Sequence, residues 1–479
     1  MEDAHPPSFT FSLSMVKMGG SDNPSMKMPS TSLSSVQRAR SPTLQRRSPS
    51  AAQSPAQESV VKSPQYKMGV DVKMMVFSWN SNKMTITAHA EGSEYYKNVV
   101  LRSNKPDSSF PYFLTEVLKE IKKQEPHIIF FATQHSRKPG DGLHSGALKE
   151  MFEGHKDPRG IQMYEKLRKS RSIGLGGAGI TGGLSGLRST IYVRWDLYNT
   201  IMTEEEEAGF ETEASLAREV SCGAGLTSNN KAIALYLRLH GTTFAFINVS
   251  IDDDKNGFKA TFISKELNEK RFKHVGRTLG CLNKIIEDLV HKPLGPNKVK
   301  VDAVVLAGDF GLRYIPPAGT GNDLMNLLKK NEAGIKRFSS TFPTPNPYEE
   351  LLKNGDELTK LLNQGKLKGN PHEGRAIASG DKISSVGPTF PPTCTLKKNR
   401  SDETCHINNR TVACPKGEDY LAKVETGYPS WCNRVLYFET SPSKSTYFIC
   451  HNYYSFDHRS MKESPQTAVV AELEFGKGI

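Results

Sequence analysis

Short apolar runs that stop at polar side chains recur along most of this chain, and they constrain its fold more than any other feature. Residues 71–80 read as a buried strand that ends in Asn80, and residues 127–132 read as a second strand followed by Gln134. Between these runs, residues 113–123 carry apolar side chains at helical spacing. Strands that alternate with helices favour an α/β fold over an all-β fold.

The same patterns predict the remaining elements. Residues 258–289 have the spacing of a long helix. Strands then cluster toward the end of the chain, which favours a sandwich of sheets. The further strands are expected at residues 190–194, 232–239, 243–249, 303–307, 434–438, 447–451 and 469–475.

Residues 1–66 differ from the rest of the chain because they are rich in serine and proline and poor in aromatic residues. Such a segment cannot bury enough apolar surface to offset the entropy of ordering, so we expect a disordered tail. Several arginines stand beside its Ser-Pro pairs, so the segment could bind partners electrostatically, with phosphorylation regulating its charge. A plain linker is the alternative.

After the tail, we expect one domain over residues 70–477, with two loop insertions. The glycine-rich residues 172–187 lack the Gly-Lys-Ser/Thr ending of a phosphate-binding loop, so a flexible loop is expected there. The acidic residues 203–213 contain four consecutive glutamates, at 204–207, which we expect in a solvated loop.

The chain has 479 residues and a formal net charge of +12, which favours polyanionic partners. No run of five or more lysines and arginines occurs, which argues against a simple nucleic-acid-binding tail. No apolar run approaches the length that spans a bilayer, and the mean hydropathy is −0.50. We therefore expect a cytoplasmic protein, with peripheral contact to anionic membranes as one option.

Seven cysteines in a chain of this length do not resemble a disulfide scaffold, and a reducing compartment is expected. Cys394, Cys405, His406 and Cys414 cluster loosely, but no Cys-x2-Cys pair occurs among them. Scattered loop thiols are therefore expected rather than a zinc site.

Residues 427–436 read Gly-Tyr-Pro-Ser-Trp-Cys-Asn-Arg-Val-Leu. This run resembles the Pro-x-Trp-Cys-Asp-Arg-(Ile/Val)-Leu signature of the inositol polyphosphate 5-phosphatases, with Asn433 in place of the family's aspartate. Other stretches resemble the family's motifs in the same order, across about residues 70–477. They are residues 78–80 (Thr-Trp-Asn in the family), 134–135 (Gln-Glu), 230–232 (Asn-Lys-Gly), 248–251 (Asn-Ser-His-Leu), 308–313 (Gly-Asp-x-Asn-Tyr-Arg), 390–393 (Phe-x-Pro-Thr) and 457–458 (Asp-His).

The resemblance implies a four-layer α-β-β-α sandwich of the endonuclease/exonuclease/phosphatase type and a Mg²⁺-dependent removal of the inositol 5-phosphate. Such a reaction needs a positioned water, a base for its proton, and cations on the developing charge. Mg²⁺ prefers carboxylate and other oxygen ligands. By position, the resemblance assigns Asp309, His458 and Asn433 to catalysis, Lys231, Arg313 and Arg434 to substrate binding, and Asn80, His135 and Asp457 to the metal.

Four positions depart from the family pattern. His135 replaces a glutamate and would suit Zn²⁺ or Mn²⁺ better than Mg²⁺. Ser250 replaces a histidine that could lie over the phosphate. Gly311 replaces an asparagine donor, a loss of a kind that can cost on the order of 10²–10³ in rate. Asn433 cannot stabilise a protonated imidazole as an aspartate would.

Together these departures predict a protein that recognises 5-phosphorylated inositol rings, free or as phosphoinositide head groups, with catalysis weak or lost. An active metal-dependent hydrolase with altered ligands is the alternative. A nuclease of the same superfamily ranks below both, since the Trp-Cys motif belongs to the phosphatase branch. Taken singly, the motif residues also have structural explanations: Asp309 as a turn residue and Trp431 as core.

Overall fold

The computed structural model describes most of the chain from residue 71 onward, all within one compact unit, Pro64–Ile479. The predicted tail over residues 1–66 and the predicted site residues Asp457 and His458 lie outside the described residues. The described stretches are 71–80, 109–137, 162–169, 173–175, 185–210, 216–222, 230–251, 265–317, 346, 348–374, 376–379, 382–385, 387–394, 404–407, 410–413, 428–441, 446–456 and 466–477, with single positions between 152 and 160 and between 323 and 328.

A first, seven-stranded sheet has the order β16-β17-β1-β2-β5-β3, with β4 also paired to β5. The parallel pair β1–β2 lies at its centre, and the other pairs are antiparallel. Its strands are β1 (Val72–Asn80), β2 (Ile128–Arg137), β3 (Tyr164–Lys169), β4 (Ile173–Leu175), β5 (Ser185–Arg194), β16 (Thr446–Phe456) and β17 (Ala468–Lys477).

A second, six-stranded sheet has the order β10-β15-β9-β8-β7-β6. Here β8 and β9 are the parallel pair. Its strands are β6 (Ala217–Ser221), β7 (Lys231–Leu239), β8 (Thr242–Ser250), β9 (Ala303–Asp309), β10 (His372–Glu373) and β15 (Asn433–Glu439). Two hairpins stand apart from both sheets: β11 (Ala376–Ser379) with β12 (Lys382–Ser385), and β13 (Thr404–Ile407) with β14 (Arg410–Ala413).

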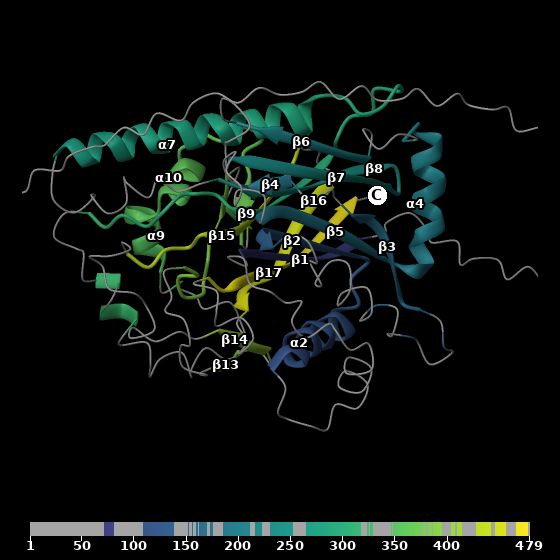
Figure 1. The fold of residues 1–479 in the computed structure, drawn as a ribbon, viewed down its shortest axis with the longest axis horizontal. Coiled ribbons are helices and arrows are strands. Elements are labelled where there is room, and N and C mark those ends of the chain that lie inside the picture. Colours follow the sequence, from purple (N-terminus) through teal and green to yellow (C-terminus); the bar gives the residue numbers. More distant parts are fainter. Residues whose placement is uncertain are drawn as a thin grey trace, which may run out of the picture. The chain divides into compact units, whose positions relative to one another are not determined.

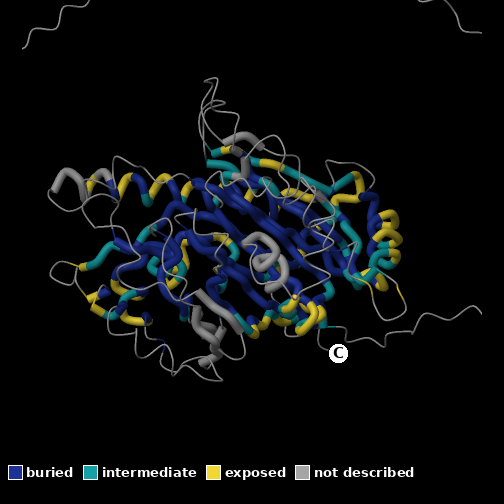
Figure 2. Tube along the Cα trace, turned by 60° about the horizontal axis from the view of Figure 1, so that its bottom comes forward, coloured by how far each residue is buried: buried dark blue, intermediate teal, exposed yellow. Residues whose placement is uncertain are grey.

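The two sheets pack face to face through one apolar core, visible as the buried centre of Figure 2. Phe130 of the first sheet lies 5.3 Å, ring centre to ring centre, from Phe246 of the second. Phe244 makes an edge-to-face contact with Phe475, with the ring centres also 5.3 Å apart. Because side chains alternate between the faces of a strand, every second residue of each central strand points into this layer.

Helices cover the outer faces of the sheets, with α7 and α2 on opposite sides of the strands in Figure 1. The long α7 packs its apolar side against the outer face of β7, β8 and β9, where Leu282 and Ile286 join the same buried cluster as Tyr236 and Ile247. This arrangement confirms the predicted α/β sandwich. The helices are α2 (Ser109–Gln124), α4 (Trp195–Glu207), α7 (Lys265–Ile286), the short π-helix η3 (Glu287–His291), α9 (Glu349–Gly355) and α10 (Glu357–Asn363).

The predicted strands over the described residues are confirmed, and so is the predicted long helix from Lys265 onward. The acidic run was predicted wrongly as a solvated loop. Glu204–Glu207 complete helix α4. Glu204 accepts hydrogen bonds from the backbone N–H of His240 (2.9 Å) and Gly241 (2.9 Å), and Glu205 is buried against Arg168. These carboxylates therefore tie α4 to the β7–β8 turn and to β3.

The structure also corrects the expectation drawn from the number of cysteines, because four of them form disulfides, and Cys394 of the predicted loop thiols is one of the four. Cys222 is disulfide-bonded to Cys281, and Cys394 is disulfide-bonded to Cys432. Cys450 is buried as a free thiol. Each bond joins segments that are distant in sequence, so the spacing of the cysteines gave no signal for the pairing. Among the described helices, none is long and apolar enough to span a bilayer.

Candidate functional site

The inward faces of both sheets are apolar along most of their length and become polar at one end. In the second sheet, four residues at this end are direct neighbours across successive strands: Lys231 on β7, Ser250 on β8, Asp309 on β9 and Asn433 on β15. We call these four residues the polar row. Alternation from the core residues of each strand places all four on the inward face. With strands about 4.8 Å apart, Lys231 and Asp309 have Cα atoms about 10 Å apart.

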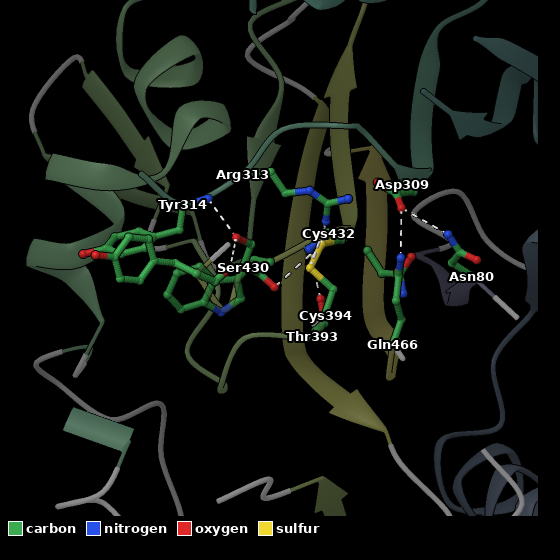
Figure 3. The surroundings of a disulfide bond; sticks show 12 residues. Asn80, Asp309, Arg313, Tyr314, Thr393, Cys394, Ser430, Cys432 and Gln466 are labelled. Carbon is green, nitrogen blue, oxygen red and sulfur yellow. Dashed lines mark hydrogen bonds between the residues drawn. A yellow bond between two sulfur atoms is a disulfide. The ribbon is translucent and has the colours of Figure 1, made fainter. Parts of the chain in front are cut away.

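The first sheet contributes amide side chains to the same end of the sandwich. Asn80 ends β1 and is paired in register with Gln134 on β2. The Asn80 Nδ2 donates to Asp309 Oδ2 at 3.1 Å, which joins the two sheets through buried side chains. Figure 3 shows this pair, with Gln466 approaching the same carboxylate from the segment before β17. Gln466 Nε2 donates to Asp309 Oδ2, also at 3.1 Å.

A second pair of amides links the sheets beside Asp309. Gln134 Nε2 donates to Asn248 Oδ1 at 2.7 Å, and both residues are fully buried. Asn248 Nδ2 in turn donates to the backbone carbonyls of Thr133 (3.0 Å) and Arg188 (2.8 Å). The bonds to backbone atoms fix the orientation of the Asn248 amide, and through it that of Gln134.

Asn433 is held by an amide hydrogen bond of its own. Its Nδ2 donates to the backbone carbonyl of Thr467 at 2.8 Å, so its Oδ1 must point the other way. The residue is fully buried, and no donor within the described part of the chain lies within hydrogen-bond distance of Oδ1. A buried acceptor of this kind calls for an N–H or O–H group.

The backbone around Asp309 leaves no room for larger residues. Gly308 has φ +151°, and a Cβ there would lie 2.0 Å from the carbonyl oxygen of Val249 on the neighbouring strand. Gly311 has φ +65°, and a Cβ there would lie 2.8 Å from the carbonyl oxygen of Ile251. The Gly311 N–H donates to Asp309 Oδ1 at 3.1 Å, which closes an Asx-type turn. The left-handed backbone and the close carbonyl oxygen of Ile251 both favour glycine at this position.

The Trp-Cys motif packs behind the polar row. Trp431 donates from Nε1 to the carbonyl of Phe390 at 2.8 Å and contacts Tyr348 edge to face. The backbone N–H of Cys432 donates to Thr393 Oγ1 at 3.0 Å, so the segment with Phe390 and Thr393 binds the segment before β15. This packing fixes the start of β15, and therefore the position of Asn433.

Arg434 does not face the polar row, which corrects the expectation that it contacts phosphate. As the neighbour of Asn433 on a strand, it points to the opposite face of the sheet. Its guanidinium is 1% exposed and pairs with Asp356, at 3.0 Å, and with Glu373. Burial opposes the charge, but Asp356 and Glu373 outweigh it and raise the pKa of Arg434 above its usual value. Arg434 therefore braces β15 against β10 and the start of α10.

The remaining predicted residues differ in placement. Lys231 is a half-buried member of the polar row. Arg313 is directed at the disulfide in Figure 3, where Nη1 donates to Cys394 Sγ at 2.9 Å and also contacts Cys432 Sγ.

His135 is half-buried at an irregularity in the β2–β5 pairing and has φ +53°. Asp457 and His458 lie outside the described residues.

Magnesium fits poorly to the donor groups that the structure describes. Asp309 is the carboxylate of the polar row, and its two oxygens already accept three N–H hydrogen bonds. Asn80 turns its NH₂ group, which cannot ligate a cation, toward that carboxylate. No group of three or more His, Cys, Asp or Glu side chains within the described residues could hold a metal ion. Mg²⁺ requires oxygen ligands, usually with at least one carboxylate among them.

Gln466 is the site residue that sequence reasoning missed. Gln466 belongs to none of the motifs. The sequence feature that could have indicated it is its position two residues before β17, because the start of β17 pairs with the end of β1. An isolated backbone bridge between Cys394 and Gln466 holds it there.

No family model matches the sequence, and no curated protein matches it. Several solved structures are similar in fold. The inositol polyphosphate 5-phosphatase domain of SPSynaptojanin, in complex with inositol (1,4)-bisphosphate and calcium ion, has 16% identity and a TM-score of 0.48 over 85% of each chain. A Cimex nitrophorin ferrous NO complex has 14% identity and a TM-score of 0.44 over 85% of this chain and 99% of that one.

An endonuclease/exonuclease/phosphatase from Bacteroides vulgatus has 11% identity and a TM-score of 0.33 over 84% of this chain and 98% of that one. Similarities at this level carry no statement about substrate or reaction.

Proposed function

We propose that this protein recognises 5-phosphorylated inositol rings, as free inositol phosphates or as phosphoinositide head groups, with hydrolysis of the 5-phosphate weak or lost. The observation that carries the proposal is the hydrogen bond between Asn80 and Asp309, which come from different sheets and are 229 residues apart. Four of the residues picked out by their resemblance to one family's site, Asn80, Lys231, Asp309 and Asn433, lie at one end of the sandwich. Chance placement of motif residues does not predict that convergence.

Lys231 is the residue we assign to the phosphate. It lies on the inward face, two strands from Asp309, at the same end of the sheet. We assign Arg313 to support of this end, because its guanidinium is directed at the disulfide. Asp309 and Asn433 would occupy the positions of the family's catalytic and orienting carboxylates, and His458 remains a proposed phosphate contact.

Weak catalysis follows from the groups that replace the family's residues. Hydrolysis needs a base for the attacking water and positive charge on the transition state. Asn433 is neutral, and Gly311 contributes a backbone N–H to Asp309 rather than a side chain to phosphate. Asp309 itself already accepts three N–H hydrogen bonds, so a proton taken from water would compete with these contacts.

The test combines binding and turnover on the full chain. Calorimetric titration with inositol 1,4,5-trisphosphate should show saturable binding. Malachite-green detection should show no phosphate release from the same ligand with Mg²⁺, Mn²⁺ or Zn²⁺. Absence of any binding would overturn the proposal.

An active metal-dependent hydrolase is the second candidate, because Asp309 and Asn80, which the resemblance assigns to catalysis and to the metal, lie together, although the Asn80 NH₂ group and not its oxygen faces the carboxylate. It predicts phosphate release with one of the three cations, abolished by Asp309→Asn or His458→Ala. Cleavage of an abasic duplex would instead favour a nuclease.

Peripheral contact with an anionic membrane and a cytoplasmic location remain predictions from the net charge and the sequence. The two disulfides make an oxidising compartment the alternative location. Binding of vesicles that contain phosphoinositides, compared with vesicles of neutral lipid, tests the membrane contact.

A further inference from the structure

The charge of the polar row is nearly balanced without any added ion. Lys231 carries one positive charge, Asp309 carries one negative charge, and Ser250 and Asn433 are neutral. The groups that reach Asp309 from outside the row are amides and a backbone N–H. Among the described residues of the row, a divalent cation would meet one carboxylate, and that carboxylate would have to give up existing hydrogen bonds.

The Asp309 carboxylate has little capacity left for a cation. An ionised carboxylate offers about four lone-pair sites, and three of them are used by Asn80, Gln466 and Gly311. The two side-chain donors come from the other sheet and from the segment before β17. Binding a cation at Asp309 would therefore break contacts that hold the two sheets together at this end.

Asn433 removes the carboxylate that could share a cation with Asp309. The two residues are direct partners on neighbouring strands. The amide NH₂ of Asn433 is committed to the carbonyl of Thr467 at 2.8 Å, and its Oδ1 accepts from no donor in the described residues. That neutral, fully buried acceptor would suit a hydroxyl or an N–H group of a ligand or a neighbour, and it adds no charge to attract Mg²⁺.

We propose that this site binds its phosphorylated ring without a divalent cation, with Lys231 supplying the positive charge that a metal would supply in a hydrolase. The inference rests on the proposed function, because it concerns how the same ligand is held. The ligand is then a polyanion that a lysine, amides and hydroxyls bind directly, with no metal ion between them. A lysine and neutral donors hold a phosphate but supply little of the charge stabilisation that its transfer requires.

The test is a pair of calorimetric titrations of the full chain with inositol 1,4,5-trisphosphate, one in EDTA and one with free Mg²⁺. The dissociation constants should agree within about twofold, which corresponds to about 0.4 kcal/mol. Binding that disappears in EDTA, or strengthens at least about tenfold with Mg²⁺, would overturn the inference and leave the proposed function intact. No binding under either condition would overturn the proposed function itself.

Manganese provides a readout that needs no ligand. In EPR titrations of the full chain with Mn²⁺ alone, the wild-type protein should leave the free Mn²⁺ signal intact. The double variant His135→Glu, Asn433→Asp returns two carboxylates to the site and should bind Mn²⁺ at least about tenfold more tightly than wild type. Stoichiometric binding by the wild type would contradict the inference. If the double variant does not fold, as a thermal melt would show, the wild-type titration alone decides.

Discussion

Asn433 and Asp309 are direct neighbours on the antiparallel strands β15 and β9, and both side chains are buried on the inward face of the sheet. One side chain of the pair is neutral and is fixed through Thr467, while the other is charged and is fixed by three N–H donors. The pair therefore carries a single negative charge. Lys231, in the same row, carries the opposing positive charge.

Adding a second charge to this pair should destabilise the protein. In the variant Asn433→Asp, repulsion between the two carboxylates raises the pKa of one of them. A carboxyl whose pKa is higher in the folded than in the unfolded protein lowers the free energy of unfolding. This loss is absent below about pH 4 and grows as the pH rises. We expect the free energy of unfolding to fall by roughly 1–3 kcal/mol at neutral pH, and Mn²⁺ to restore part of it.

Urea unfolding at pH 4.5 and 7.5 measures this effect. Asn363→Asp, at an exposed position on α10, serves as the control and should show little change at either pH. Equal stability of Asn433→Asp and wild type at pH 7.5 would contradict the account of the pair.

A side chain at position 311 should destabilise the protein. The left-handed backbone opposes any side chain there, and so does the carbonyl oxygen of Ile251, which would lie 2.8 Å from an added Cβ. We expect Gly311→Asn and Gly311→Ala to lose about 1–3 kcal/mol of unfolding free energy. The control is Gly276→Ala within α7, where a Cβ meets nothing within 4 Å and a gain of about 0.5–1 kcal/mol is expected. Gly311→Ala as stable as wild type in urea unfolding would show that the strain argument is wrong.

Removing the Arg434 side chain should unfold the protein rather than affect binding alone. Arg434→Met leaves Asp356 and Glu373 as buried, uncompensated carboxylates, for which the expected cost is about 3–5 kcal/mol. The triple variant that adds Asp356→Asn and Glu373→Gln should recover part of this loss. A variant Arg434→Met with wild-type stability but no ligand binding would instead place Arg434 in contact with ligand.

Stability should fall as the pH is lowered through the range in which His127 titrates. Burial, followed by the nearby Arg194, lowers the pKa of His127 from 6.5 to about 4. Its Nδ1 accepts a hydrogen bond from the Lys73 backbone N–H at 3.1 Å, which requires an unprotonated nitrogen. Between pH 6.5 and about pH 4 the unfolded chain binds more protons than the folded one. The free energy of unfolding therefore decreases by up to about 3 kcal/mol as the pH is lowered through this range.

The variant His127→Gln should be less sensitive to pH over this window, as measured by urea unfolding at several pH values. His451→Gln, at an exposed position on β16, should keep the wild-type slope. A wild-type slope in His127→Gln would mean that another group is responsible.

The cysteine pairing can be tested by peptide mapping without reductant. Mass spectrometry should find the peptides of Cys222 and Cys281 linked, and those of Cys394 and Cys432 linked. Cys450 should react with alkylating agents only after unfolding, since it is buried. Alkylation of Cys394 or Cys432 in the native, unreduced protein would contradict the pairing.

Local patterns were enough to predict most of the central strands, because apolar runs with polar ends are local. Asn80, Lys231, Asp309 and Asn433 were predicted as site residues by their resemblance to family motifs, and the structure gathers them at one end of the sandwich. Side-chain direction was the information that motifs lacked. Asn433 and Arg434 are adjacent in sequence, yet alternation along β15 sends one to the polar row and the other to the opposite face.

Long-range partners could not be predicted in the same way. Gln466 reaches Asp309 only because β17 pairs with β1. The disulfides likewise depend on which distant segments the fold brings together. The four glutamates at 204–207 were misread because their binding partners, the β7–β8 turn and Arg168, are distant in sequence.

The most direct test of the central claim is calorimetric titration of the variant Lys231→Met with inositol 1,4,5-trisphosphate. Loss of the row's positive charge should weaken binding at least about tenfold, while Lys353→Met, at an exposed position on α9, should bind like wild type. Wild-type affinity in Lys231→Met, with the fold intact by circular dichroism, would contradict the claim that the polar row holds the phosphorylated ring.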